Sequence, residues 1–136
     1  MQTFRIAGVY LVTLGAFLAL DALWLGVVAR GLYKRELGHL LASEVRWGAA
    51  AVFYLIFVAG VLAVVVWPNQ DHSLWRTVVL GGVFGLCAYA AYDLTNMATL
   101  PRWPIRVAVV DMVWGTVLTG STAAAGWLAF RWLLRG

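Results

Sequence analysis

Long runs of hydrophobic residues alternate with short polar segments along the chain. Four runs stand out, over residues 6–29, 47–67, 77–100 and 107–130. Each is long enough for an α-helix, which rises about 1.5 Å per residue, to cross the hydrocarbon core of a bilayer. Because lipid offers no partners to backbone N–H and C=O groups, each run is predicted to be helical. The pattern therefore predicts an all-α polytopic membrane protein, with one domain of four transmembrane helices in an up-down bundle over residues 1–136.

The polar segments between these runs differ in character. Pro68–Ser73 and Pro101–Pro104 are short and rich in residues that favour turns. Arg30–Arg46 is longer, and its apolar residues recur at helical spacing while the charged residues lie mostly elsewhere. This segment is predicted to be a short amphipathic helix at the membrane interface. A helical extension of the second run is the alternative.

The composition supports a membrane protein. Hydrophobic residues make up 63% of the chain and charged residues 12%, whereas soluble domains carry about 25% charged residues. A soluble chain of this length has too much surface to bury so many apolar side chains. The single cysteine, Cys87, excludes a disulfide framework. The net charge of +4 comes from basic residues scattered between apolar runs, so nucleic acid is not an expected partner.

The basic residues also predict the orientation of the chain. With four spans, the two termini and Pro68–Ser73 share one side, which holds four basic residues. The opposite side, called the connector side below, carries Arg30–Arg46 and Pro101–Pro104 and holds six. The positive-inside rule therefore predicts that the connector side faces the cytoplasm and that both termini lie outside.

Small residues are spaced for close packing of helices. Gly81 and Gly85 are four residues apart in the third run, and Gly120 and Ala124 are four apart in the fourth. Such spacing lets two helix backbones approach closely inside a membrane.

Three aspartates lie inside the predicted spans, where a charge costs about 2.5 kcal/mol or more. Asp21 is nine residues before Arg30, and Asp93 is nine before Arg102. Asp111, on a span that runs in the opposite direction, is five residues after Arg106. All three are thus predicted to lie in the same half of the membrane, roughly 7–14 Å from its connector side.

Further polar side chains fall at the same depth. Tyr54 lies eight residues after Arg46, and residues 85, 89, 92, 93 and 96 form one stripe on the third span. A polar cavity open to the connector side is therefore predicted. Its predicted ligand-binding residues are Asp21, Trp24, Tyr54, Tyr89, Tyr92, Asp93, Asn96, Asp111 and Trp114, and its predicted mouth is Arg30, His39, Arg46, Arg102 and Arg106.

Two tryptophans sit apart from the six that mark membrane interfaces. Trp24 follows Asp21 by three residues, and Trp114 follows Asp111 by three. Because the two spans run in opposite directions, each indole should lie level with the other aspartate. We expect reciprocal contacts, with Trp24 donating to Asp111 and Trp114 donating to Asp21.

These segments resemble a family of small bacterial four-helix membrane proteins, domain of unknown function 2177. The resemblance covers nearly the whole chain and is carried by Asp21-x-x-Trp24-Leu25-Gly26, Leu37-Gly38-His39-Leu40, Tyr89-Ala90-Ala91-Tyr92-Asp93-Leu94-Thr95-Asn96 and Asp111-x-x-Trp114-Gly115. It implies the four-helix fold, a location in the bacterial inner membrane, and signature positions at Asp21, Asp93, Asn96 and Asp111. It implies no known activity.

The leading hypothesis for function is binding of a lipid headgroup or an amphipathic small molecule in the polar cavity. A few placed polar groups in an apolar bundle are typical of a binding pocket, and membrane lipids are the expected partners. A proton- or cation-coupled transporter is the first alternative, since intramembrane carboxylates carry protons. Four helices are few for alternating access, so that hypothesis includes a homodimer.

Two other hypotheses remain. A membrane-embedded, lipid-modifying enzyme would use Asp21, Asp93 and Asp111 as metal ligands, with His39 beside them if its helix folds back, or as general acid and base. A structural or accessory membrane protein would use its polar residues only to fix helix packing. Neither haem nor retinal is expected, because no histidine lies within a span and the only lysine, Lys34, lies outside them.

Overall fold

The computed structural model describes residues 1–136, and its regular secondary structure is entirely helical, with no strand. Four helical segments are long and apolar enough to cross a membrane, over Gln2–Val28, Trp47–Asn69, Leu74–Thr99 and Ile105–Arg135. The predicted fold class is therefore confirmed, and each span extends beyond the predicted run at one or both ends. The elements are α1 (Gln2–Leu23), η1 (Trp24–Val28), α2 (Arg30–Leu37), α3 (Trp47–Gly60), η2 (Val61–Val66), η3 (Trp67–Asn69), α4 (Leu74–Thr99), α5 (Ile105–Phe130) and η4 (Arg131–Arg135).

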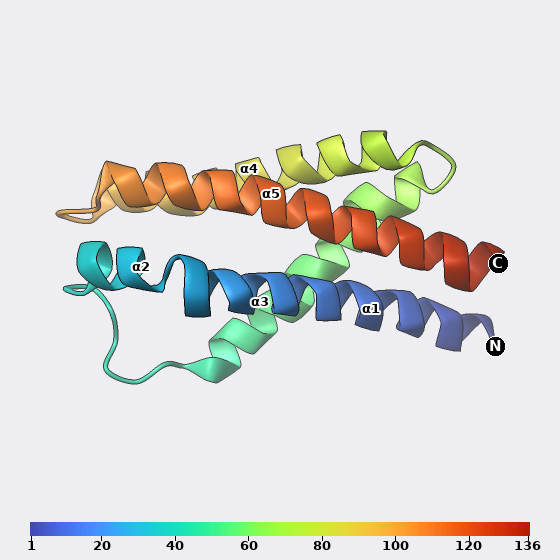
Figure 1. Ribbon diagram of the computed structural model, residues 1–136, viewed down its shortest axis with the longest axis horizontal. Coiled ribbons are helices and arrows are strands. Elements are labelled where there is room, and N and C mark those ends of the chain that lie inside the picture. The colour runs from blue at the N-terminus through green and yellow to red at the C-terminus, as the bar shows by residue number, and fades with distance from the viewer.

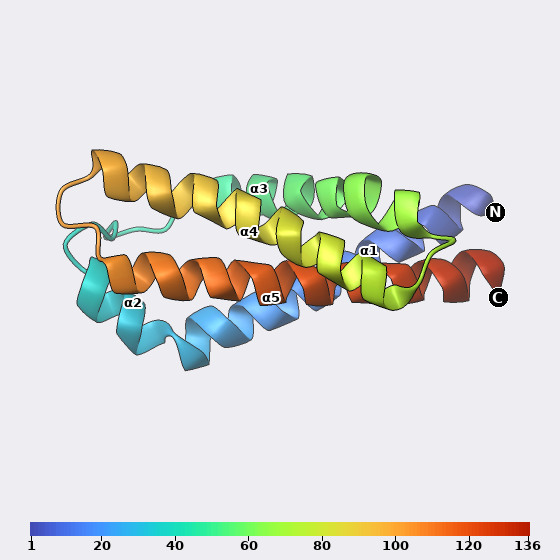
Figure 2. The same ribbon diagram turned by 90° about the horizontal axis from the view of Figure 1, so that it is seen from above.

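The spans run up and down, with both termini at one end of the molecule and α2 at the other (Figures 1 and 2). The turn between α4 and α5 lies at the same end as α2, and the turn before α4 lies at the same end as the termini. The grouping of segments on two sides is thus as predicted. The bundle is not a set of parallel rods, because α3 crosses α1 and α5 obliquely (Figure 1).

The interfacial helix is shorter than predicted. It spans Arg30–Leu37, and residues 38–46 form turns and irregular chain before α3 begins at Trp47. It follows the first span after a break at Ala29, where φ is −108° and ψ is 2°. It is therefore no extension of the second span. Three of its eight residues are basic and one is acidic, and only Leu37 is buried, as a helix at an interface requires.

Local sequence explains where α4 and α5 begin. The hydroxyl of Ser73 accepts a hydrogen bond from the backbone N–H of Arg76, which caps the first turn of α4. Pro104 precedes α5 in an extended conformation, and a proline at this place cannot continue a preceding helix. The chain reverses between the two helices through Arg102, which has a positive φ of 57°.

Helices α4 and α5 pack backbone to backbone at the predicted small residues. A Cβ atom added to Gly81 would lie 2.6 Å from the Cβ of Ala123. A Cβ added to Gly85 would overlap the carbonyl oxygen of Gly115 and the hydroxyl of Thr119. The small residues thus permit a close approach, as their spacing indicates, and this approach depends on the absence of a side chain at both glycines.

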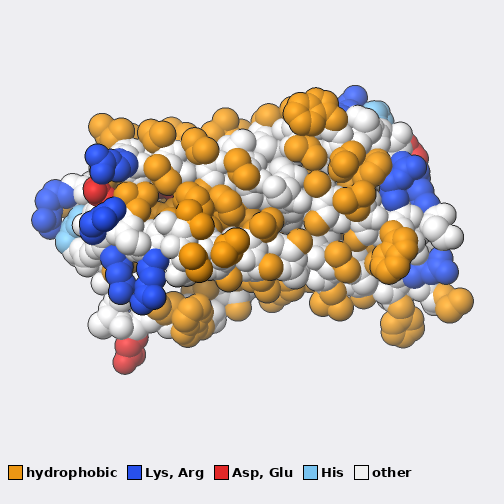
Figure 3. All heavy atoms as spheres, in the orientation of Figure 1, with side chains coloured by type: hydrophobic (Ala, Val, Ile, Leu, Met, Phe, Trp, Pro, Cys, Tyr) orange, Lys and Arg blue, Asp and Glu red, His pale blue; other side chains and the backbone are white.

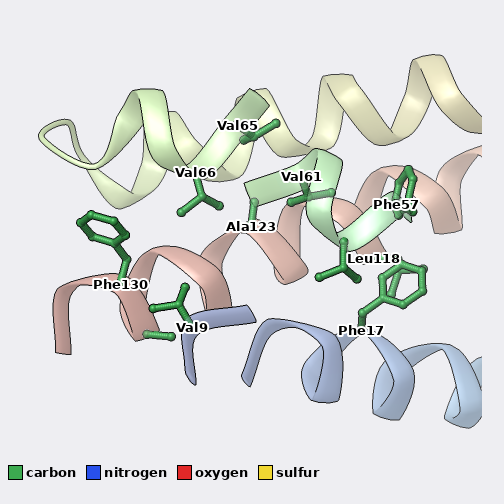
Figure 4. Close-up of a cluster of buried hydrophobic side chains, with 11 residues drawn as sticks. Val9, Phe17, Phe57, Val61, Val65, Val66, Leu118, Ala123 and Phe130 are labelled. Atoms are coloured by element: carbon green, nitrogen blue, oxygen red, sulfur yellow. The ribbon is translucent and has the colours of Figure 1, made fainter. Parts of the chain in front are cut away.

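Helix α5 is the centre of the bundle and contributes more buried residues than any other element. The main apolar core lies between α1, α3 with η2, and α5 (Figure 4). Phe17 of α1, Phe57 of α3 and Leu118 of α5 belong to it, and Phe17 and Leu118 are fully buried. This core occupies the part of the molecule between the cavity region and the end that carries the termini.

The outer surface of the spans is apolar. Large hydrophobic side chains are exposed along every span, among them Leu11, Ile56, Val83 and Val117. The space-filling view shows basic side chains gathered at the two ends and very few charges between them (Figure 3). This distribution fits a chain whose middle faces lipid and whose ends face the two membrane interfaces.

Candidate functional site

The predicted polar residues surround a cavity of about 330 Å³ in the connector-side half of the bundle. We call it the aromatic cavity, because six of its ten lining residues are aromatic. It is lined by Asp21, Trp24, Leu25, Phe53, Tyr54, Ala88, Tyr89, Tyr92, Asp111 and Trp114. All four spans contribute to it, so residues from positions 21 to 114 of the chain meet at one place.

Asp21 lies near the C-terminal end of α1 and joins three spans. One of its carboxylate oxygens accepts a hydrogen bond of 3.2 Å from the indole N–H of Trp114 on α5. The other accepts a hydrogen bond of 3.2 Å from the hydroxyl of Tyr54 on α3. The predicted contact between Trp114 and Asp21 is confirmed. A buried carboxylate is retained here because both oxygens have a donor.

Trp24 has a different partner from the one predicted. Its indole N–H donates to the hydroxyl of Tyr33 over 3.1 Å, and that hydroxyl donates to Asp111 over 2.6 Å. The prediction of a direct contact between Trp24 and Asp111 is therefore wrong, because the hydroxyl of Tyr33 lies between them. Trp24 begins the π-helical turn η1, and its ring stacks on the ring of Trp114 at a centroid distance of 4.5 Å.

The position of Tyr33 on α2 affects its ionisation. Burial raises the pKa of its hydroxyl above the ordinary value near 10, and the hydrogen bond to Asp111 raises the pKa further. The hydroxyl therefore stays protonated at neutral pH and keeps donating to the carboxylate. This bond ties α2 to α5.

A second cavity, of about 350 Å³, adjoins the first. We call it the connector cavity, because α2 and the turn before α5 contribute to its wall. Its lining residues are Leu25, Arg30, Tyr33, Lys34, Leu37, Leu41, Tyr92, Asp93, Trp103, Val107 and Asp111. Leu25, Tyr92 and Asp111 line both cavities, so these three side chains form a shared wall.

Asp93 is the unusual residue of the connector cavity. Its side chain is fully buried, and neither carboxylate oxygen has a hydrogen-bond partner within the protein. The indole N–H of Trp103, on the wall of the same cavity, is also buried without a partner. Buried polar groups are nearly always paired. The carboxyl groups of Asp93 and Asp111 lie close enough to share a proton, and no other group of the protein reaches Asp93 or the indole N–H of Trp103. An occupant of the connector cavity could satisfy these groups.

The structure separates the predicted site into parts. Seven of the nine predicted ligand-binding residues line the aromatic cavity, and Asp93 lines only the connector cavity. Asn96 lines neither, because it lies one turn beyond Asp93, near the exposed end of α4. Tyr92 lines both cavities although it is 58% exposed.

One of the predicted mouth residues lines a cavity. Arg30 lines the connector cavity, whereas His39, Arg46 and Arg102 line neither cavity. His39 and Arg46 belong to the segment predicted to be a helix through residue 46, which ends instead at residue 37. Arg102 lies in the turn between α4 and α5. Arg106 is directed to Glu36 of α2, with 3.9 Å between the charged groups.

Several contributors were missed by the sequence argument. Lys34 and Trp103 line the connector cavity, and Phe53 and Ala88 line the aromatic cavity. The signal for Lys34 was its spacing of four residues from Arg30, which places both on one face of a helix. Trp103 was assigned to the membrane interface, and its sequence neighbours give no sign of the cavity.

No group of three histidine, cysteine, aspartate or glutamate side chains is placed to hold a metal ion. Asp21 and Asp93 line different cavities, so Asp21, Asp93 and Asp111 do not converge on one point. The geometry gives no support to the hypothesis of a metal-dependent enzyme. The groups present are suited instead to hydrogen bonding, ion pairing and aromatic contact.

Four apolar spans with two adjoining cavities on one side define a polytopic α-helical membrane protein with an intramembrane polar site. Residues 6–128 match the family described as "Predicted membrane protein (DUF2177)", and the chain belongs to this family. The resemblance found in the sequence is thereby confirmed. No curated protein and no solved structure matches the chain significantly.

Proposed function

We propose that this protein binds an amphipathic molecule of the membrane, with its apolar part in the aromatic cavity and its polar part toward the connector side. The observation that carries the proposal is the shared wall of Leu25, Tyr92 and Asp111 between the two cavities. The aromatic cavity suits the apolar end of such a ligand, and the connector cavity, with its charged side chains, suits the polar end.

The aromatic cavity supports the first half of this proposal. Eight of its ten lining residues are hydrophobic, and the polar groups of Asp21, Tyr54 and Trp114 already satisfy one another. Such a cavity favours an apolar ligand, because few of its polar groups need a hydrogen-bond partner from the ligand. Phe53 of α3 and Tyr92 of α4 line the cavity, and both are exposed residues. This supports entry of a molecule dissolved in the bilayer between α3 and α4.

We also propose that the connector side faces the cytoplasm, in the inner membrane of a bacterial cell, with both termini outside. The support is the excess of basic residues on that side, six against four. In this orientation the ligand is drawn from the cytoplasmic leaflet.

The binding proposal is tested with purified protein in detergent and dihexanoyl phospholipids as probes. A ligand that binds the folded state raises the midpoint of thermal unfolding. We expect the wild type to show this shift, and Asp21→Asn and Ala88→Leu to lose most of it. Asp21→Asn disturbs the hydrogen bonds of the cavity wall, and Ala88→Leu fills the cavity.

Asp71→Asn is the matched control, because Asp71 lies at the opposite end of the molecule and is exposed. It should retain the full lipid-dependent shift. Equal shifts in all four proteins would contradict binding in the aromatic cavity, and the absence of any shift in the wild type would contradict the proposed function itself.

A further inference from the structure

We infer that the connector cavity is the subsite for an amine-bearing phosphate ester, such as the headgroup of a zwitterionic phospholipid. The ammonium group would lie against Asp93 and the phosphate against Arg30 and Lys34. This inference rests on the proposed function, because the acyl chains attached to such a headgroup would occupy the aromatic cavity.

The unpartnered carboxylate of Asp93 is the first argument. Both of its oxygens are buried, and no N–H or hydroxyl group of the protein reaches them. A buried carboxyl group beside a second one, that of Asp111, is stabilised by a cation or by several hydrogen bonds. A primary ammonium supplies a charge and three N–H donors, and a neutral or anionic headgroup supplies no charge of the required sign.

The aromatic side chains around Asp93 are the second argument. Tyr92 and Trp103 meet edge to face at a centroid distance of 5.8 Å with their planes 85° apart. Both line the connector cavity together with Tyr33. Aromatic walls beside a carboxylate are the usual surroundings of a bound ammonium group, because the ring faces attract the cation.

The basic residues on α2 are the third argument. Arg30 and Lys34 are four residues apart on one helix, so they share a face, and both line the cavity. Neither forms an ion pair within the protein, since the two ion pairs present are Arg106 with Glu36 and Arg135 with Asp71. They are free to bind a phosphate through charge-assisted hydrogen bonds.

The basic and acidic side chains of the cavity come from different helices. Arg30 and Lys34 lie on α2, whereas Asp93 lies on α4 and Asp111 on α5. A zwitterion carries a group complementary to each kind of side chain. The unpaired indole N–H of Trp103 would donate to an oxygen of the same phosphate ester. A headgroup that carries only a phosphate supplies no cation to the carboxylate of Asp93.

The experiment compares the dissociation constants of two probes for the purified full chain. Dihexanoyl-phosphatidylethanolamine and dihexanoyl-phosphatidylglycerol share their chains and phosphodiester, and only the first carries an amine. We expect the wild type to bind the amine lipid at least about tenfold more tightly. In Asp93→Asn this ratio should fall to near one, because the neutral side chain no longer attracts the ammonium.

Three further variants separate the parts of the subsite. Trp103→Leu leaves Asp93 in place and should also lower the ratio, which keeps the test valid if Asp93→Asn does not fold. The double variant Arg30→Gln/Lys34→Gln should weaken the binding of both lipids and leave the ratio of their dissociation constants unchanged. Arg35→Gln, on the same helix but outside the cavity, should change neither constant.

Free phosphoethanolamine distinguishes a lipid from a soluble source of the same chemistry. If both the free compound and the lipid bind in a way that depends on Asp93, the subsite is supported. A much larger dissociation constant for the free compound would then identify the ligand as a membrane lipid. Equal binding of the two lipids by the wild type would overturn the inference and leave the proposed function standing. It would mean that water, and not an ammonium group, occupies the connector cavity. Failure of both lipids to bind would overturn the proposed function as well.

Discussion

The indole N–H of Trp114 and the carboxylate of Asp21 connect α5 to α1 across 93 positions of sequence, with 3.2 Å between nitrogen and oxygen. Trp114→Phe removes this donor and keeps an aromatic ring for stacking on Trp24. We expect the free energy of unfolding to fall by about 1–2 kcal/mol, the value of a hydrogen bond to a charged group inside a membrane protein.

The measurement is a titration with sodium dodecyl sulfate in mixed micelles, followed by circular dichroism. Trp132→Phe is the matched control, because Trp132 is 76% exposed at the end of the last span, and it should change the free energy by less than about 0.5 kcal/mol. Equal effects of the two substitutions would show that the contact with Asp21 contributes nothing.

Gly85→Ala should destabilise the packing of α4 on α5. The added methyl group meets the backbone of Gly115 and the side chain of Thr119, so the helices must separate, at a cost of about 1–3 kcal/mol. Gly15→Ala is the control, because nothing lies within 4 Å of a Cβ at that position. There the better helix propensity of alanine should leave stability unchanged or raise it by about 0.5–1 kcal/mol. If Gly85→Ala left the free energy of unfolding unchanged, the two helices would tolerate a larger separation.

Asp93→Asn should stabilise the protein when no lipid is added. The substitution keeps the shape of the side chain and replaces one of two neighbouring buried carboxyl groups, those of Asp93 and Asp111, by a neutral amide, so a gain of about 1–3 kcal/mol is expected. The unfolding midpoint in a detergent without phospholipid measures this effect. A loss of stability would show that Asp93 has a structural partner.

Stability should fall at high pH because of Tyr33. Its pKa is raised in the folded state by burial and by the hydrogen bond to Asp111, so the unfolded chain loses this proton first as the pH rises. The contribution is therefore complete below about pH 10 and is lost progressively above it. Tyr33→Phe should show a shallower decline of the unfolding free energy between pH 9 and about pH 11 than the wild type. Parallel declines would refute this role for the hydroxyl.

The orientation of the chain is measured by cysteine labelling in a Cys87→Ala background. A membrane-impermeant maleimide should label His72→Cys in intact cells, and it should label Ser43→Cys only after the cells are permeabilised. These residues lie in turns at opposite ends of the molecule. The reverse pattern would place the connector side outside and contradict the positive-inside argument.

The spans and the depth of the aspartates could be predicted from the sequence because both follow from length and helical rise. Counting from Arg30 and Arg106 was enough to place Asp21 and Asp111 in the same half of the bundle, and opposite helix directions were enough to pair Asp21 with Trp114. These relations depend only on regular helices. They therefore survive changes in packing detail.

The connector cavity could not be predicted, because its wall depends on irregular chain. The break at Ala29 sets the direction of α2, and no periodicity describes a single residue with φ of −108° and ψ of 2°. Tyr33 comes between Trp24 and Asp111 for that reason. Trp103 reaches the cavity from a turn, and its position depends on the positive φ of Arg102.

The break at Ala29 also has an evolutionary consequence. It makes α2 a segment of eight residues that supplies the basic wall of the connector cavity and contributes only one residue, Leu37, to the buried interior. Under the proposed binding mode, substitutions on this segment should change how tightly a phosphate-bearing ligand is held while the four spans keep their packing. The affinity for phosphate and the packing of the spans are thus encoded in separate parts of the chain, and relatives that hold such a ligand with different affinity should differ first within residues 30–37.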